Sequence, residues 1–298
     1  MNPLVSISCI TYNHAPYIRQ CLDGFMMQQT NFAFEVLIHD DASTDGTTDI
    51  IKEYEAKYPD IIKPIYEEEN QWVKGRRGSA IFNFPRAKGK YIAMCEGDDY
   101  WTDPLKLQRQ VDFLETHSDY TLCGHRYKAY VEKDSTFIDF GADIDGTFDL
   151  EYMVNHQKFC STLSVVFRNS AIHINELNRY PYVLDLILFY HLLKSGKGYC
   201  MPDIMAVYRM HNGGIWSTLN YDAMAIGDIK HRLIIYKVEK SRQAALFIRT
   251  LITKRIGRRW MLRHGGLFLR CMNVIYEQYG LKGLINFIYR YLVLRERY

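Results

Sequence analysis

Residues 88–101 read KGKYIAMCEGDDYW, and this stretch decides how the 298-residue chain folds. The apolar run from Tyr91 to Cys95 is bounded by turn residues and predicts a short buried strand. Three acidic residues, Glu96, Asp98 and Asp99, follow where that strand should end. Because ligands bind at the carboxyl ends of the strands in open α/β sheets, we expect a binding site here.

The acidic residues of this stretch have two interpretations. Three carboxylates within four residues repel one another unless a cation neutralises them. Mg²⁺ and Mn²⁺ prefer a few carboxylate oxygens together with substrate phosphate, which favours a divalent-metal site. The alternative is an acidic turn that caps the next helix. Since Asp103 before Pro104 already predicts that cap, we favour the metal interpretation.

The surrounding sequence alternates between strand and helix patterns. Strands are predicted at 4–11, 34–39, 61–66 and 91–95, and helices at 17–27, 47–57, 79–87 and 104–116. Such alternation predicts an α/β fold with a mostly parallel, Rossmann-like sheet and helices on both faces. Residues 121–131 have period two, which predicts an antiparallel or edge strand. Further along, strands are expected at 163–167 and 205–210, a helix at 183–193, and helices from about residue 221 onward.

Four blocks, taken in order, resemble family 2 glycosyltransferases with the GT-A fold. They are residues 5–13 (VSISCITYN), 38–47 (IHDDASTDGT), 89–101 (GKYIAMCEGDDYW) and 207–216 (VYRMHNGGIW). The resemblance implies a GT-A domain over residues 1–217, with a nucleotide-sugar-binding half (1–100) and an acceptor half (101–217). Residues 218–298 lie outside it and are predicted to form a basic helical C-terminal region.

The resemblance also implies an activity and a set of donor-binding residues. It implies an inverting, metal-dependent transfer of a hexose-type sugar from a nucleotide-diphosphate sugar, usually a uridine one. The acceptor would be a glycan or lipid-linked acceptor in bacterial cell-surface polysaccharide synthesis. The base and ribose would be held by Thr11, Tyr12, Asn13, Asp40 and Asp41. A packing aromatic at Tyr12 and a turn cap at Asp41 are the alternatives.

The metal and the diphosphate would be held by residues of the third and fourth blocks. Asp98, Glu96 and His211 are the expected ligands of Mn²⁺ or Mg²⁺, and Asp98 and Asp99 are expected to contact the donor. Glu96 ranks below Asp98 because the family more commonly has aspartate there. Asp99 could bind metal, orient the sugar or only close the turn. A hydrogen-bonded histidine at a strand end is the alternative for His211.

Asp185 is the expected catalytic base. It is a lone acid near the start of an otherwise apolar helix, and a buried carboxylate with a raised pKa suits proton abstraction. Its place before the fourth block resembles the family's base, although Leu186 follows it where the family often has tryptophan. The alternative is an aspartate that interacts with the helix dipole.

The distribution of charge and cysteine bears on location and partners. From Lys230 onward there are 16 basic and 3 acidic residues, whereas the rest of the chain is acidic overall. The segment 246–269 interleaves apolar and basic residues, which predicts docking on an anionic membrane. Packing on the catalytic domain, or on a second subunit of a homo-oligomer, is the alternative. Seven scattered cysteines, with no leader and no spanning segment in sequence, predict a cytoplasmic protein, either free or peripheral on the cytoplasmic face.

Two other functions compete with glycosyl transfer. A sugar nucleotidyltransferase uses a similar sheet and metal but normally needs a glycine-rich basic loop after the first strand, and residues 12–16 do not provide one. A non-enzymatic protein that binds nucleic acid or another anionic surface through the basic helices is the second alternative. Because no recognised nucleic-acid module occurs in the sequence, we expect no nucleic-acid partner.

Overall fold

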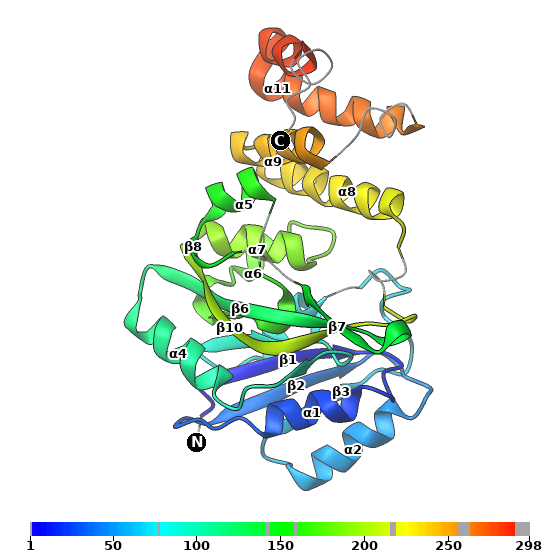
Figure 1. The fold of residues 1–298 in the computed structure, drawn as a ribbon, viewed down its shortest axis with the longest axis vertical. Coiled ribbons are helices and arrows are strands. Elements are labelled where there is room, and N and C mark those ends of the chain that lie inside the picture. The colour runs from blue at the N-terminus through cyan, green and yellow to red at the C-terminus, as the bar shows by residue number, and fades with distance from the viewer. Residues whose placement is uncertain are drawn as a thin grey trace. The chain divides into compact units, whose positions relative to one another are not determined.

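A computed structural model describes residues 2–76, 78–140, 144–157, 160–214, 219–255 and 263–289 (Figure 1). The chain divides into two compact units, Met1–Asp149 with Phe159–Gly214, and Leu150–Lys158 with Ile215–Tyr298. The boundary after residue 214 lies close to the expected one after residue 217. Helix α5 (Leu150–His156) groups with the C-terminal helices, which the sequence did not indicate.

The first unit contains the following elements, in chain order. They are β1 (Val5–Thr11), α1 (Ile18–Met26), β2 (Phe34–Asp40), α2 (Thr47–Lys57), β3 (Ile62–Tyr66), α3 (Ser79–Phe82), β4 (Tyr91–Met94), β5 (Tyr100–Trp101), α4 (Lys106–Thr116), β6 (Tyr120–Val131), β7 (Thr136–Phe140), β8 (Gly146–Phe148), β9 (Val166–Arg168), α6 (Ile174–Leu177), α7 (Asp185–Lys194) and β10 (Lys197–Met210). Single 3-10 turns occur at Phe84–Arg86, Glu132–Asp134, Thr162–Ser164 and Asn169–Ala171.

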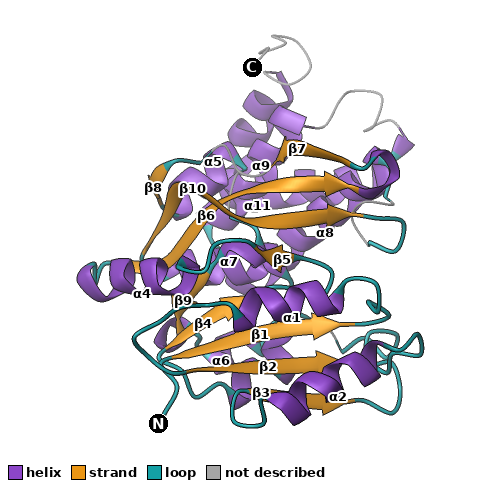
Figure 2. Cartoon of the chain, turned by 60° about the horizontal axis from the view of Figure 1, so that its bottom comes forward, coloured by secondary structure: helices purple, strands orange, loops and turns teal. Residues whose placement is uncertain are grey.

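These strands form one sheet in the order β3-β2-β1-β4-β9-β6-β10-β5, with β7 on β6 and β8 on β10 (Figure 2). Pairing is parallel across β3-β2-β1-β4 and between β6 and β10, and antiparallel elsewhere. The expected α/β class is therefore confirmed, while the parallel, Rossmann-like part is limited to the first four strands of this order. β6 is antiparallel to β7 and β9, as expected, but it is not an edge strand.

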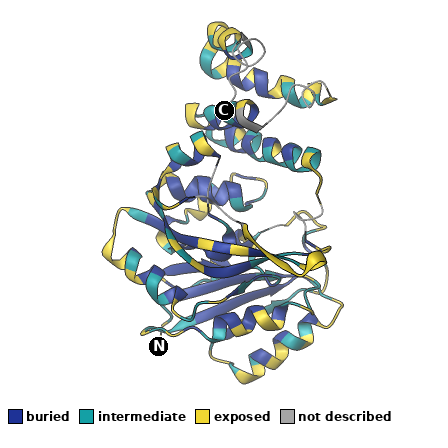
Figure 3. Cartoon of the chain, viewed as in Figure 1, coloured by how far each residue is buried: buried dark blue, intermediate teal, exposed yellow. Residues whose placement is uncertain are grey.

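Helices cover both faces of the sheet. Helices α1 and α2 lie on one face and α6 and α7 on the other (Figures 1 and 2). Strand β1 is buried along almost its whole length, with Val5, Ile7 and Cys9 fully inaccessible (Figure 3). Burial on both faces explains why this strand has a nearly continuous apolar sequence.

Three elements differ from the sequence-based expectation, each for a local reason. The helix expected over 79–87 stops at Phe82, because Pro85 has no N–H with which to continue it. Helix α4 begins at Lys106, two residues later than expected. Asp103 therefore caps the turn before the helix, where its Oδ1 accepts the Leu105 N–H at 2.8 Å. β10 begins eight residues earlier than expected. The sequence pattern predicted a later start because Pro202 interrupts it, at the point where the register of the strand shifts.

The second unit is a set of helices, α5, α8 (Tyr221–Glu239), α9 (Arg242–Arg255) and α11 (Gly265–Tyr289), and α9 packs against the other three. Phe247, Leu251 and Ile252 of α9 are at most 1% exposed within it. These three apolar side chains are covered by neighbouring helices, and docking of segment 246–269 on an anionic membrane stays a prediction. Residues 256–262 of the same segment lie outside the described residues. None of the described helices is long and apolar enough to cross a membrane.

A buried lysine in the first unit predicts a pH-dependent stability. Lys106 is fully buried, with its Nζ 4.0 Å from the Trp101 ring centroid and 2.8 Å from Gln110 Oε1, to which it donates. Burial lowers the pKa of Lys106 to about 7, against 10.5 for an ordinary lysine. Between these two values the unfolded chain binds more protons than the folded one, so this lysine makes the free energy of unfolding increase with pH.

We expect Lys106→Met to remove that increase, which is at most about 1.4 kcal/mol per pH unit. Urea unfolding of wild type and variant at pH 6.5 and 9.5 measures it, and other titrating groups cancel in the difference. Lys128→Met, at an exposed position of β6, is the matched control. A pH dependence shared by wild type and Lys106→Met would contradict the prediction.

Candidate active site

The acidic loop between β4 and β5 is packed tightly against β1. The Gly97 N–H donates to the carbonyl of Ile10 at 3.0 Å, and a Cβ at Gly97 would lie 2.6 Å from Thr11 Oγ1. Only glycine allows the loop to approach the strand this closely. Thr11 is 1% exposed and its side chain supports the loop from beneath, while its contact with a nucleotide stays a prediction.

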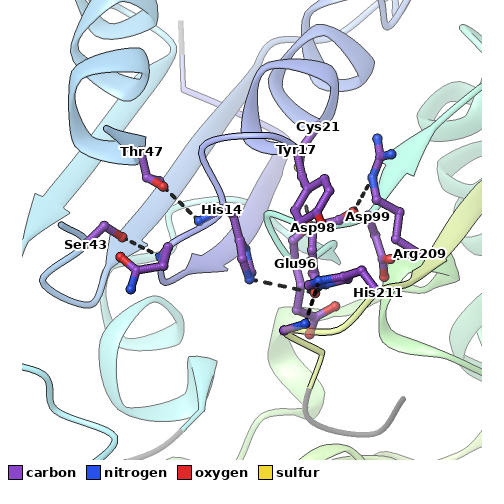
Figure 4. A network of polar contacts seen from close by, with 12 residues as sticks. His14, Tyr17, Cys21, Ser43, Thr47, Glu96, Asp98, Asp99, Arg209 and His211 are labelled. Carbon is purple, nitrogen blue, oxygen red and sulfur yellow. Dashed lines mark hydrogen bonds and ion pairs between the residues drawn. The ribbon is translucent and has the colours of Figure 1, made fainter. Parts of the chain in front are cut away.

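Two imidazoles converge on the carboxylate of Asp98 (Figure 4). Nε2 of His211 lies 3.1 Å from Asp98 Oδ2, and Nε2 of His14 lies 3.8 Å from the same oxygen. His211 Nδ1 accepts the Gly213 N–H at 3.2 Å, which fixes the orientation of the ring. Burial acts to raise the pKa of Asp98, but the His211 hydrogen bond and the charges of both histidines outweigh it, and the pKa is lowered. Asp98 is therefore an ionised carboxylate at neutral pH.

Asp99 faces away from this pair and closes the loop onto β10. Its Oδ1 accepts the backbone N–H of Arg209 at 2.8 Å, and Arg209 Nε donates to the carbonyl of Asp98 at 2.7 Å. The guanidinium lies 4.6 Å from the Tyr100 ring centroid and 5.2 Å from that of Tyr17. Burial, followed by the charges of neighbouring carboxylates, raises the pKa of Asp99 well above its usual range. Of the three roles left open for Asp99, these contacts support closure of the turn.

Glu96 lies beside the expected catalytic base. Its Oε2 accepts a hydrogen bond from Thr162 Oγ1 at 2.7 Å. Burial, and then the charge of Asp185, raises the pKa of Glu96 to about 8. Asp185 is the first residue of α7, and burial raises its pKa to about 6. The structure thus brings Asp185 within electrostatic reach of the acidic loop, where its carboxylate is ionised at neutral pH.

The expected metal ligands are brought together only in part. Among the described residues, no group of three or more His, Cys, Asp or Glu side chains is arranged to hold a metal ion. The predicted trio is therefore not assembled, and Glu96, a largely protonated carboxyl at neutral pH, is the member that fits least. The ionised Asp98 and the adjacent His211 do fit Mn²⁺ or Mg²⁺, which commonly take one or two protein ligands and complete their shell with substrate phosphate and water.

The carboxylates expected to bind base and ribose make contacts within the protein. Asp40 accepts from Ser43 N at 3.2 Å and Ser43 Oγ at 2.5 Å, and also from Thr48 Oγ1. Asp41 accepts the N–H groups of Gln71 and Trp72 at 2.6 and 3.1 Å. Both are at most 5% exposed, so they shape the two loops at this end of the sheet. Their contact with a nucleotide stays a prediction.

Tyr12 and Asn13 lie on the neighbouring β1 loop. The Tyr12 side chain is 44% exposed and therefore accessible to a ligand. Asn13 has a left-handed backbone (φ 54°), and its Oδ1 accepts the Thr44 N–H at 2.8 Å. Asn13 thus joins the two loops, and the nucleotide-binding role of both residues stays a prediction.

Sequence reasoning missed four residues that contact the candidate site: His14, Tyr17, Thr162 and Arg209. His14 directly follows the first block that carries the family resemblance, and Arg209 stands inside the fourth. The positions of His14 and Arg209 in the sequence could have suggested that both lie near the candidate site. Neither position indicates a contact with the acidic loop, since that contact depends on how distant strands are paired.

The sequence pattern of the family described as Glycosyl transferase family 2 matches residues 6–173. An uncharacterized protein of Mycobacterium tuberculosis is 40% identical over 221 residues, which cover 73% of this chain and 62% of the relative. The chain thus spans about three fifths of the length of that relative.

Two further similarities extend over most of the chain. TuaG of Bacillus subtilis, named as a teichuronic acid biosynthesis glycosyltransferase, is 32% identical over 220 residues, 72% of this chain and 82% of its own. The structure of residues 1–349 of TarS from S. aureus, in complex with UDP-GlcNAc, aligns with a TM-score of 0.64 at 16% identity and covers 95% of this chain and 88% of that one. This likeness concerns the fold, and with it the expected GT-A type is confirmed.

Proposed function

Since this chain belongs to glycosyl transferase family 2, we propose that it transfers a sugar from a UDP-sugar to a glycan or lipid-linked acceptor of a bacterial cell surface, with inversion at the anomeric carbon. One observation carries this proposal. An ionised Asp98, contacted by His211 at the end of β4, lies in the same acidic cluster as a half-buried Asp185 whose pKa is raised to about 6. Asp98 is thereby suited to hold a metal-bound diphosphate, and Asp185 is suited to accept a proton.

The two groups would have separate tasks. Asp98 and His211 would hold Mn²⁺ or Mg²⁺ together with the donor diphosphate, and the bound ion would offset the negative charge that develops on the leaving group. Asp185 would accept the proton of the acceptor hydroxyl as its oxygen bonds to the anomeric carbon. The bond from that carbon to the diphosphate breaks on the opposite face, which inverts the configuration.

The donor and the acceptor class are inferred from the relatives. TarS was solved with UDP-GlcNAc, and the name of TuaG refers to teichuronic acid biosynthesis. Both support a uridine-diphosphate donor and a cell-wall type acceptor for this chain. The exposed Tyr12, beside the loops shaped by Asp40 and Asp41, would then stack on the uracil ring.

Thermal unfolding with a panel of nucleotide sugars tests the proposal. A ligand that binds only the folded state raises its stability by mass action, by about 2.7 kcal/mol at a hundredfold excess over Kd. We expect UDP and one UDP-sugar to raise the Tm when Mn²⁺ or Mg²⁺ is present, and EDTA to abolish the shift. If no uridine or other nucleoside diphosphate shifts the Tm with either metal, the proposed function is wrong.

A further inference from the structure

The β1 loop around His14 is unusually well fixed by the loop that follows β2. Four hydrogen bonds join them: Asn13 N–H to Ser43 Oγ (2.9 Å), Thr44 N–H to Asn13 Oδ1 (2.8 Å), His14 N–H to Thr47 Oγ1 (2.8 Å) and Ala15 N–H to Asp45 Oδ2 (2.9 Å). Consecutive backbone N–H groups from Asn13 to Ala15 thus all donate to side chains of one neighbouring loop. The backbone that carries the His14 imidazole is held in place on both sides of Cα.

The imidazole itself lies within the acidic site. Its Nε2 approaches Asp98 Oδ2 at 3.8 Å, on the same oxygen that His211 contacts (Figure 4). The ring is nearly perpendicular to that of His211, with centroids 6.1 Å apart, and 6.3 Å from that of Tyr17. Nδ1 of His14 is buried and has no hydrogen-bond partner among the residues that the structure describes.

An arrangement of this kind is not expected from stability alone. Leaving a buried polar atom unpaired typically costs about 1–3 kcal/mol, and such atoms are a reason to look for a function. A carboxylate that must meet a metal and a diphosphate benefits when its orientation is fixed beforehand by neighbouring groups. His14 is in the position to do this for Asp98, on the same oxygen that His211 contacts.

We propose that His14 is a positioning residue for Asp98, and that the Ser43–Thr47 loop acts on the diphosphate end of the donor through the backbone of His14. This inference rests on the proposed function, because it concerns the same site. It assigns to Ser43, Asp45 and Thr47 a role in orienting the carboxylate, without contact to the nucleotide. The part of the imidazole that does so is Nε2, which faces Asp98.

Substitution of His14 by Gln and by Asn distinguishes a role in positioning Asp98 from simple packing of the side chain. The Gln amide reaches the place of Nε2, whereas the shorter Asn amide reaches that of Nδ1, and both are polar and uncharged. Mn²⁺ binding without donor, followed by electron paramagnetic resonance, and UDP binding with Mn²⁺, followed by calorimetry, are the measurements. Thermal unfolding without ligand verifies that each variant is folded. His117→Ala, at an exposed histidine, is the control.

We expect His14→Ala and His14→Asn to weaken Mn²⁺ and UDP binding by about 10- to 100-fold, as lost contacts to a metal ligand typically do. His14→Gln should recover most of this loss, with unfolding temperatures similar among the three. Equal losses in the Gln and Asn variants would overturn the inference, because packing alone would then explain both. Wild-type affinity in His14→Ala would overturn it as well, while the proposed function would stand. If wild type binds neither Mn²⁺ nor UDP, the proposed function fails and this inference fails with it.

Discussion

Asp185→Asn is expected to lower turnover by about 10² to 10⁴ while leaving UDP affinity within about twofold of wild type. The carboxylate would take the acceptor proton in the transition state and would make no contact with the nucleotide. Asn keeps the size of the side chain and its place at the start of α7, but it cannot accept a proton at neutral pH. Turnover under saturating donor and acceptor, together with calorimetric UDP binding, measures the two quantities separately.

The pH profile gives an independent test of the same residue. Burial raises the pKa of Asp185 to about 6, and only the ionised form is a base. Wild-type turnover should therefore increase as the pH rises through about 6, and this increase should disappear in Asp185→Asn. Asp60→Asn, at an exposed acid after α2, is the control and should keep the wild-type profile. Full turnover in Asp185→Asn, or a loss of UDP binding instead of turnover, would remove Asp185 from the role of base.

Asp98→Asn is expected to lower metal-dependent UDP binding by about 100-fold or more. Mutation of a residue that only contacts a metal ligand already lowers metal affinity by about 10- to 100-fold, and Asp98 would be a ligand itself. The change removes the charge that His211 and His14 face, while the amide keeps the shape. Without a metal, wild type and variant should bind UDP equally weakly. A Mn²⁺ titration of UDP binding measures the difference between the two proteins.

Asp99→Asn is the matched comparison for Asp98→Asn. An Asn side-chain oxygen at position 99 can still accept the Arg209 N–H, so the contact that closes the loop onto β10 is kept. We expect this variant to have the smaller loss. If Asp98→Asn retained wild-type UDP affinity across the Mn²⁺ titration, or if Asp99→Asn had the larger effect, the assignment of the metal to Asp98 would be wrong.

Local patterns were sufficient for much of the first unit. β1 and β2 begin and end within one residue of their expected bounds, because apolar runs and turn-forming residues mark them directly. The acidic loop was also placed at the end of β4 for that reason. Longer-range features were less accessible. The start of β10 was missed because its pairing with β6 and β8, and not its own pattern, holds the Pro202 region in the sheet.

The carboxylates of the candidate site show where sequence information ends. Glu96 and Asp98 are two residues apart, and both were expected to be metal ligands. The composition and order of residues indicated that an acidic site exists, and which family it resembles. The tertiary structure places two histidines at Asp98 and lowers the pKa of Asp98, whereas it places Asp185 near a half-buried Glu96 and raises the pKa of Glu96. Charge state depends on burial and on the nearest charges. These charges come from the segments that follow β1 and β10 and from α7, which only folding brings to the end of β4.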